Sequence, residues 1–228
     1  RLGVVLPLPF RNGIIYMEKP GGAGFTTPFI LDNSATSLSG SYNTLRNFSL
    51  TIRGGYNSLN WNQAPSGDTN FGASGVNQGY IRIGVSAANP WVGNITLRDI
   101  VINDITSASN PSLAVYTSTG SVTLNDVDVD DADNSESIRI TTNSGNINIF
   151  DSEVTSGDDN YGFNLTTTSG TITLTDVLVD NHSDGDGINI NAGTGAVTLD
   201  NADVTDSDNG DGINVTTTGG TVNLTDVD

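Results

Sequence analysis

The 228-residue sequence contains no cysteine, only one lysine (Lys19) and only one histidine (His182). Because the chain has no cysteine, it cannot form disulfides or thiolate metal sites. The chain has 8 basic and 26 acidic residues, a formal net charge of −18, so it lacks the basic surface that attracts nucleic acids and acidic membranes. It also lacks any run of about 18 apolar residues. We therefore expect no nucleic-acid partner and no membrane insertion.

The charge that is present is concentrated in the second half of the chain. Residues 1–112 carry five acids and seven bases, a net charge of +2. Residues 113–228 carry 21 acids and one base, Arg139, a net charge of −20. Eleven of the 15 aromatic residues lie in the first part. This division predicts a mixed N-terminal region followed by an acidic array of small side chains.

The acidic half repeats with a strict period of 25 residues. Three short segments alternate between apolar and other residues in each repeat, and β-branched residues are common in them, which is typical of half-buried strands. The first residue of each segment recurs at Leu113, Ile138, Phe163, Ile188 and Ile213, at Val122, Ile147, Ile172, Val197 and Val222, and at Val127, Ser152, Val177 and Ala202.

Three such segments per 25 residues, repeated in register, predict an all-β, right-handed parallel β-helix with three strands per rung. Each rung adds about 4.8 Å along the axis. We interpret residues 1–228 as one domain. Residues 1–48 form an irregular N-terminal cap, residues 49–112 form irregular rungs with long loops, and residues 113–228 form the regular rungs.

Two columns of turn residues accompany the repeat. A glycine recurs at Gly120, Gly145, Gly170, Gly195 and Gly220, and it predicts a left-handed backbone conformation in that turn. A short polar residue recurs at Asp126, Asp151, Asp176, Asn201 and Asp226. Because Asp and Asn side chains bond to nearby backbone N–H groups in tight turns, we expect this second column to be structural.

The last repeat stops at Asp228 inside a rung, without a capping element. An open strand edge invites pairing with another chain. We expect either that the native polypeptide continues or that another subunit covers this end. The partner would then be a second copy or another surface protein, bound through the uncapped C-terminal end.

The loops that close the rungs are rich in carboxylates, which are suitable oxygen ligands for Ca²⁺. No other cofactor is expected. The spacing matches neither an EF-hand nor a glycine-rich calcium nonapeptide, so a solvated acidic face or a high-salt habitat also explains it. The candidate calcium ligands are Asp130, Asp131, Asp133, Asp158, Asp159, Asp184, Asp186, Asp208 and Asp211.

Catalytic signals are sparse. Polysaccharide hydrolysis needs paired carboxylates, and Gly157-Asp158-Asp159 resembles the Gly-Asp-Asp motif of polygalacturonases, but that family's Gly-His-Gly and Arg-Ile-Lys motifs are missing. His182 lies in an acidic loop without a basic partner. We therefore predict no enzymatic activity.

Carbohydrate could also stack on Tyr56, Trp61, Phe71 and Trp91, although core or cap packing explains these aromatic residues better.

The segment Ser49–Trp61 (SLTIRGGYNSLNW), followed by the LTDV-type repeats, resembles bacterial and archaeal cell-surface right-handed β-helix repeat proteins. The resemblance implies a secreted or cell-surface location, a stalk-like shape and an adhesive or structural role. Some proteins of this kind act on polysaccharides. Our expectation is a non-enzymatic extracellular structural or adhesive module, which would be a subunit of a surface filament if copies assemble head to tail. The alternatives are a polysaccharide-binding or polysaccharide-degrading protein and a Ca²⁺-dependent surface repeat protein.

Overall fold

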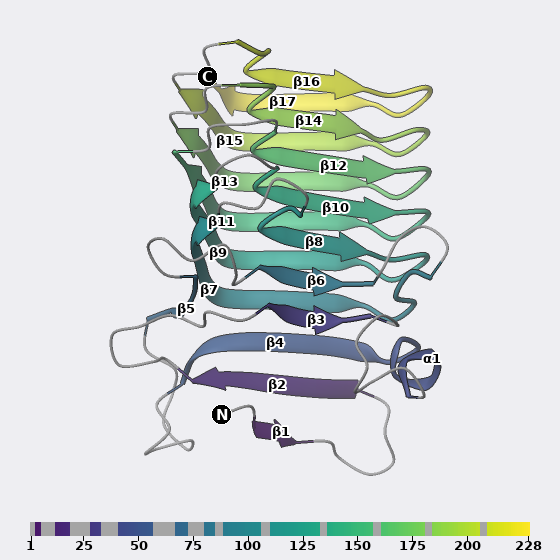
Figure 1. Ribbon diagram of the computed structural model, residues 1–228. Coiled ribbons are helices and arrows are strands. Elements are labelled where there is room, and N and C mark those ends of the chain that lie inside the picture. Colours follow the sequence, from purple (N-terminus) through teal and green to yellow (C-terminus); the bar gives the residue numbers. More distant parts are fainter. Residues whose placement is uncertain are drawn as a thin grey trace.

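The computed structural model describes residues 3–5, 12–18, 28–32, 41–56, 67–72, 80–84, 89–105, 110–132, 136–156, 161–180, 184–205 and 209–228. Strands make up most of these residues, and Figure 1 shows the strands stacked along one axis. The single described helix is the four-residue α1 (Tyr42–Leu45). The architecture is a parallel β-solenoid, which confirms the predicted fold class.

The strands form two sheets. The ten-stranded sheet has the order β1-β2-β4-β7-β9-β11-β13-β15-β17, and β5 also pairs with β7. These strands are β1 (Gly3–Val5), β2 (Asn12–Glu18), β4 (Ser49–Tyr56), β5 (Thr69–Phe71), β7 (Ile95–Ile105), β9 (Val122–Ala132), β11 (Ile147–Thr155), β13 (Ile172–Asp180), β15 (Val197–Thr205) and β17 (Val222–Val227).

The seven-stranded sheet has the order β16-β14-β12-β10-β8-β6-β3. Its strands are β3 (Phe29–Leu31), β6 (Ile81–Ile83), β8 (Leu113–Tyr116), β10 (Ile138–Thr142), β12 (Phe163–Thr167), β14 (Ile188–Asn191) and β16 (Ile213–Thr216). Every pairing between neighbouring rungs is parallel, and only β1 runs antiparallel to its neighbour β2.

The pairing register follows the 25-residue period. Ile138 pairs with Phe163, and Ile172 pairs with Val197. The looser rung expected before the regular repeats is also present, because Ile81 pairs with Leu113. Within residues 1–48, β2 belongs to the ten-stranded sheet, where it pairs in parallel with β4. The strand β3 belongs to the seven-stranded sheet, where it pairs in parallel with β6. That segment therefore contributes strands to both sheets.

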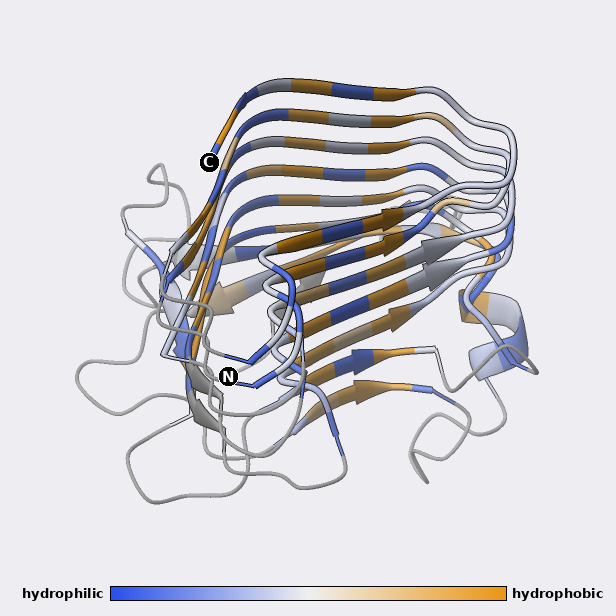
Figure 2. Cartoon of the chain, turned by 90° about the horizontal axis from the view of Figure 1, so that it is seen from above, coloured by the Kyte–Doolittle hydropathy of each residue, from blue (hydrophilic) through white to orange (hydrophobic). Residues whose placement is uncertain are grey.

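The second and third predicted segments of each rung lie on one long, bent strand. The bend falls at the Asp/Asn column, where φ is positive at Asp99, Asp126, Asp151, Asp176, Asn201 and Asp226 (46° to 59°). Seen along the axis, the long strands turn sharply near one end (Figure 2). The column therefore shapes the backbone through its positive φ, and the expected side-chain bonds to nearby backbone N–H groups stay a prediction. The right-handed sense and the division into three strands per rung stay predictions.

The left-handed conformation predicted for the glycine column is wrong. None of Gly120, Gly145, Gly170, Gly195 and Gly220 has a positive φ. Glycine is needed there for another reason: a Cβ on Gly170 would lie 2.0 Å from the Gly145 carbonyl oxygen of the rung below. The turns of successive rungs are stacked too closely for any side chain at this position. The Asp/Asn column, rather than the glycine column, has the left-handed backbone conformation.

The core is a set of continuous apolar ladders between the two sheets. In β13, Ile172, Leu174 and Val179 are fully buried, and their neighbours along the strand face outward. Figure 2 shows the resulting alternation of apolar and polar residues in each rung. Burying one such side chain stabilises the fold by roughly 1.5–3 kcal/mol. The stacking therefore buries apolar surface that a single rung would expose.

Candidate functional site: an acidic groove beside the bend

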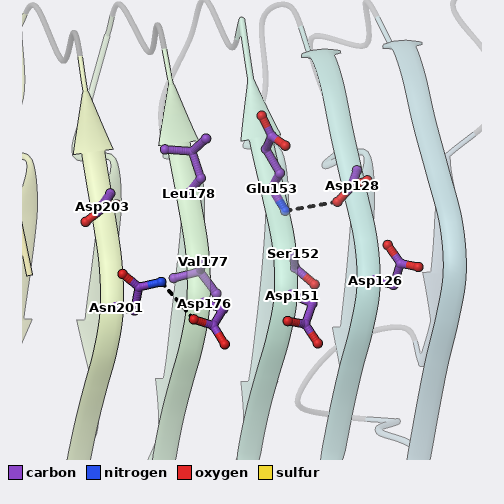
Figure 3. A pocket seen from close by; sticks show the side chains of 10 residues that line it. All are labelled: Asp126, Asp128, Asp151, Ser152, Glu153, Asp176, Val177, Leu178, Asn201 and Asp203. Atoms are coloured by element: carbon purple, nitrogen blue, oxygen red, sulfur yellow. Dashed lines mark hydrogen bonds between the residues drawn. The ribbon is translucent and has the colours of Figure 1, made fainter. Parts of the chain in front are cut away.

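The bend of the long strands creates a hollow on the outer face of the ten-stranded sheet. We call it the acidic groove, and its volume is about 360 Å³. The lining comes from β9, β11, β13 and β15, and Figure 3 shows its acidic side chains on successive rungs. The lining residues are Asp126, Asp128, Asp151, Ser152, Glu153, Asp176, Val177, Leu178, Asn201 and Asp203. None of these ten residues is basic or aromatic.

Two columns of the repeat place the acids in the groove. The first is the bend column, whose left-handed φ is tolerated better by Asp and Asn than by most side chains. The second lies two residues further along each strand and contains Asp128 and Glu153 on neighbouring rungs. The period of 25 therefore stacks carboxylate upon carboxylate, because the strands are parallel and in register.

Hydrogen bonds between rungs fix several of these side chains. The Glu153 N–H donates to Asp128 Oδ1 at 3.1 Å. Asn201 Nδ2 donates to Asp176 Oδ1 at 2.7 Å, and both bonds are drawn in Figure 3. The Ser152 hydroxyl, which is almost fully buried, donates to the Phe150 carbonyl oxygen at 2.9 Å. These bonds tie several of the lining side chains to the sheet.

Burial and repulsion between acids weaken the acidity of two groove residues. The pKa of Asp128 is raised to about 6, mainly by burial and to a smaller extent by repulsion from Asp126, Glu153 and Asp68. The Glu153 N–H opposes this change by bonding to the carboxylate. Burial also raises the pKa of Asp126, followed by repulsion from Asp68, Asp99 and Asp151. The groove therefore favours protons and other positive charge.

The predicted calcium ligands are only partly within the described chain. Four of them are described, and their carboxylates or backbones bond to neighbouring rungs. Asp130 Oδ1 accepts the Thr155 hydroxyl at 2.7 Å, and Asp184 Oδ1 accepts Asn209 Nδ2 at 2.8 Å. Asp186 Oδ1 accepts the Asp211 N–H at 3.0 Å. The side chain of Asp131 and all of Asp133, Asp158, Asp159 and Asp208 lie outside the described residues.

In the described part of the chain, no three Asp, Glu or His side chains come together in a way that could hold a metal ion. Calcium binding by the closing loops therefore stays a prediction. The catalytic motif considered above, Asp158-Asp159, and His182 also fall outside the described residues.

The single base of the acidic half lies away from the groove. Arg139 belongs to β10 of the seven-stranded sheet, where its Nε pairs with Glu136 and its guanidinium donates to the Tyr116 hydroxyl at 3.3 Å. Glu136 also accepts Asn164 Nδ2 at 2.9 Å. This network ties three rungs together, so Arg139 is committed to a structural ion pair on another sheet.

Two of the four aromatic candidates for carbohydrate stacking are core residues. Phe71 and Trp91 are 1% and 4% exposed. Trp91 Nε1 donates to the Phe48 carbonyl oxygen at 2.9 Å, and its ring packs edge-on against Tyr42 at 6.0 Å. Their predicted packing role is confirmed. The side chains of Tyr56 and Trp61 lie outside the described residues.

Sequence reasoning missed the acidic groove. It considered the bend column alone and did not combine it with the outward acids two residues further on, such as Asp126 with Asp128. The available signal was the Asp-x-Asp or Asp-x-Glu spacing repeated one period apart. Because alternation along a strand places i and i+2 on the same face, this spacing puts the acids on one surface.

No family model, curated protein or solved structure matches this chain. Among the described residues, no helix has the length and apolar character needed to cross a membrane.

Proposed function

We propose that this protein is a non-enzymatic structural module, a rigid β-solenoid segment that acts outside the cell or at its surface. The observation that carries the proposal is the uninterrupted register of the regular rungs. From β8 to β16 and from β9 to β17, each strand pairs with the equivalent residues of the next rung. Such an array holds its two ends at a fixed separation.

The packing supports a mechanical role. Equivalent core positions, such as Ile140, Leu165 and Ile190, are fully buried on three successive rungs. Each rung contacts only its neighbours, so rigidity comes from repetition rather than from long-range tertiary contacts. The high net negative charge keeps such a rod soluble and opposes lateral association.

The edge formed by β16 and β17 suits a partner with the same strand pattern. Val222 and Leu224 are 41% and 57% exposed, whereas the equivalent Val197 and Leu199 one rung earlier are fully buried. Unpaired strand edges with apolar ladders bind further strands. We propose that further strands pair here, supplied either by the same polypeptide or by a second copy or another surface protein; a second copy would give a head-to-tail filament.

The location and the assembly state can be tested together. An antibody against residues 113–228 should label intact cells of the native source, and negative-stain electron microscopy of native material should show rods or regular fibres. Confinement of the protein to the cytoplasmic fraction would contradict the extracellular role. Discrete globular particles without a rod axis would contradict the structural one.

The acidic groove favours one second candidate, action on polysaccharides. Glycoside hydrolysis uses two carboxyl groups, one of which stays protonated near neutral pH, and Asp128 has such a raised pKa among neighbouring acids. The test is release of reducing or unsaturated sugars from a polysaccharide panel. The structural proposal expects no release. Release that Asp128→Asn abolishes would replace it with an enzymatic function.

A further inference from the structure

Six Asn-x-Ser/Thr sequons occur in the chain, and this motif is the acceptor for N-linked glycosylation in secreted proteins. They begin at Asn47, Asn94, Asn164, Asn181, Asn214 and Asn223. The sugar is attached to the side-chain Nδ2, so the acceptor in a folded protein must be exposed and its Nδ2 must be accessible. These two requirements separate the five sequons that the structure describes, because Asn181 lies outside the described residues.

The two sequons of the seven-stranded sheet are enclosed by bonds between rungs. Asn164 in β12 and Asn214 in β16 are both partly buried. Asn164 Nδ2 donates to Glu136 Oε1 at 2.9 Å, and Asn214 Nδ2 donates to Asp186 Oδ2 at 3.0 Å. Because a sugar is bulky, its attachment to either nitrogen would have to displace these neighbours.

Two other sequons are exposed but meet the requirements less well. Asn47 lies in the turn after α1, and its Nδ2 donates to the Asn43 carbonyl oxygen at 2.8 Å. Asn223 lies on the edge strand β17, where it pairs with Thr198. The further strands of the proposed function would partly cover Asn223, as Thr198 is covered one rung earlier.

Asn94 meets both requirements. It is exposed and directly precedes β7, and it faces outward together with Thr96 because Ile95 and Leu97 are fully buried. Asn94 Oδ1 accepts the Ser121 N–H of the next rung at 2.9 Å, whereas Asn94 Nδ2 has no hydrogen-bond partner among the described residues. Since a glycosylated asparagine keeps its carbonyl oxygen, the bond to Ser121 can persist after modification.

We infer that Asn94 carries an N-linked glycan. In the reaction, Asn94 Nδ2 forms a bond to the anomeric carbon of a sugar held on a phosphate-linked lipid carrier. The bond between that carbon and the phosphate oxygen breaks, the lipid phosphate leaves, and Nδ2 gives up one proton to solvent. The inference rests on the proposed extracellular location, because N-linked sugars are added to secreted proteins, and it adds a covalent modification to the structural role.

Peptide mass spectrometry of protein purified from the native source tests the inference. The peptide that contains Asn94 should be heavier by a whole number of sugar residues in most molecules, whereas the peptide that contains Asn164 should have its unmodified mass. Unmodified Asn94 in protein from the cell surface would overturn the inference and leave the proposed function standing. Unmodified Asn94 in protein found only in the cytoplasm would overturn both.

Variants of the sequon hydroxyls, made in cells of the native source, control the assignment. Thr96→Ala should lose the sugar from Asn94, while Thr96→Ser should retain it, because the motif requires a hydroxyl at this position. Thr166→Ala is the matched control, since it removes the sequon hydroxyl of Asn164 and should change no sugar. A sugar that persists at Asn94 in Thr96→Ala, or equal modification of Asn94, Asn164 and Asn214, would contradict selection by the structure.

Discussion

At the scale of single residues, the same side chain type serves backbone shape and surface charge. Asp126, Asp151 and Asp176 adopt a positive φ that lets the long strands bend, and their carboxylates then face the acidic groove. Asn201 takes the same backbone conformation without a charge. The bend therefore requires the conformational tolerance of Asp or Asn, while the charge is a separate property.

Substitution of Asp176 separates these two properties. Asp176→Gly and Asp176→Val both remove the carboxylate and its bond to Asn201, but only valine is strained at φ 54°. We expect Asp176→Val to lower the free energy of unfolding by about 1–2 kcal/mol relative to Asp176→Gly. Urea unfolding of the two variants at one pH measures the difference. Equal stabilities would mean that the bend does not depend on backbone conformation at this residue.

The raised pKa of Asp128 predicts a pH dependence. Between the ordinary Asp value of 3.8 and about 6, the folded protein holds a proton on Asp128 that the unfolded chain has lost. The contribution of Asp128 to stability is therefore present at pH 4 and is lost as the pH rises through 6. Because the side chain is partly exposed, we expect a loss of about 1 kcal/mol.

Asp128→Asn checks this pH effect, since asparagine keeps the acceptor for the Glu153 N–H but does not titrate in this range. The variant should be more stable than the unmodified chain at pH 7.5 and similar to it at pH 4. Asp203→Asn, at another acid of the groove, is the control. If the stabilities of both variants depend on pH in the same way, the burial of Asp128 is not the source of the pH dependence.

At the scale of elements, the sequence pattern predicted the strand register well and the turns less well. Inward residues such as Ile147 and Ile172 repeat every 25 positions, and pairing follows from that repeat because a slip of one residue would expose the apolar face. The glycine column was misassigned because positive φ and close backbone approach both select glycine. Only the stacking distance between rungs separates the two causes, and distance is not visible in a single sequence.

The close stacking of the glycine column gives a test at this scale. A Cβ on Gly170 would lie 2.0 Å from the Gly145 carbonyl oxygen, whereas a Cβ on Gly219 would meet no atom within 4 Å. We expect Gly170→Ala to lower the free energy of unfolding by about 1–3 kcal/mol, as overpacking does, and Gly219→Ala to have little effect. Thermal unfolding followed by circular dichroism compares them. A harmless Gly170→Ala would show that the turns are not tightly stacked.

At the scale of the whole molecule, repetition explains both the rod and its charge. A period of 25 aligns the apolar ladders inside and, by the same alignment, places the acids outside in columns. The solenoid class could be predicted because it depends on a pattern shared by many residues. The acidic groove could not be predicted from either column alone, since it arises where the bend column and the next outward column lie on the same face.

Removal of one complete rung tests the central claim most directly. Deleting residues 163–187 joins Gly162 to Ile188 and preserves the register, because Ile188 is the equivalent of Phe163 one period later. Small-angle X-ray scattering should then show a folded rod shortened by about 4.8 Å, with circular dichroism of the same shape. An unfolded or collapsed product would contradict the account, since it would mean that the rungs are not interchangeable structural units.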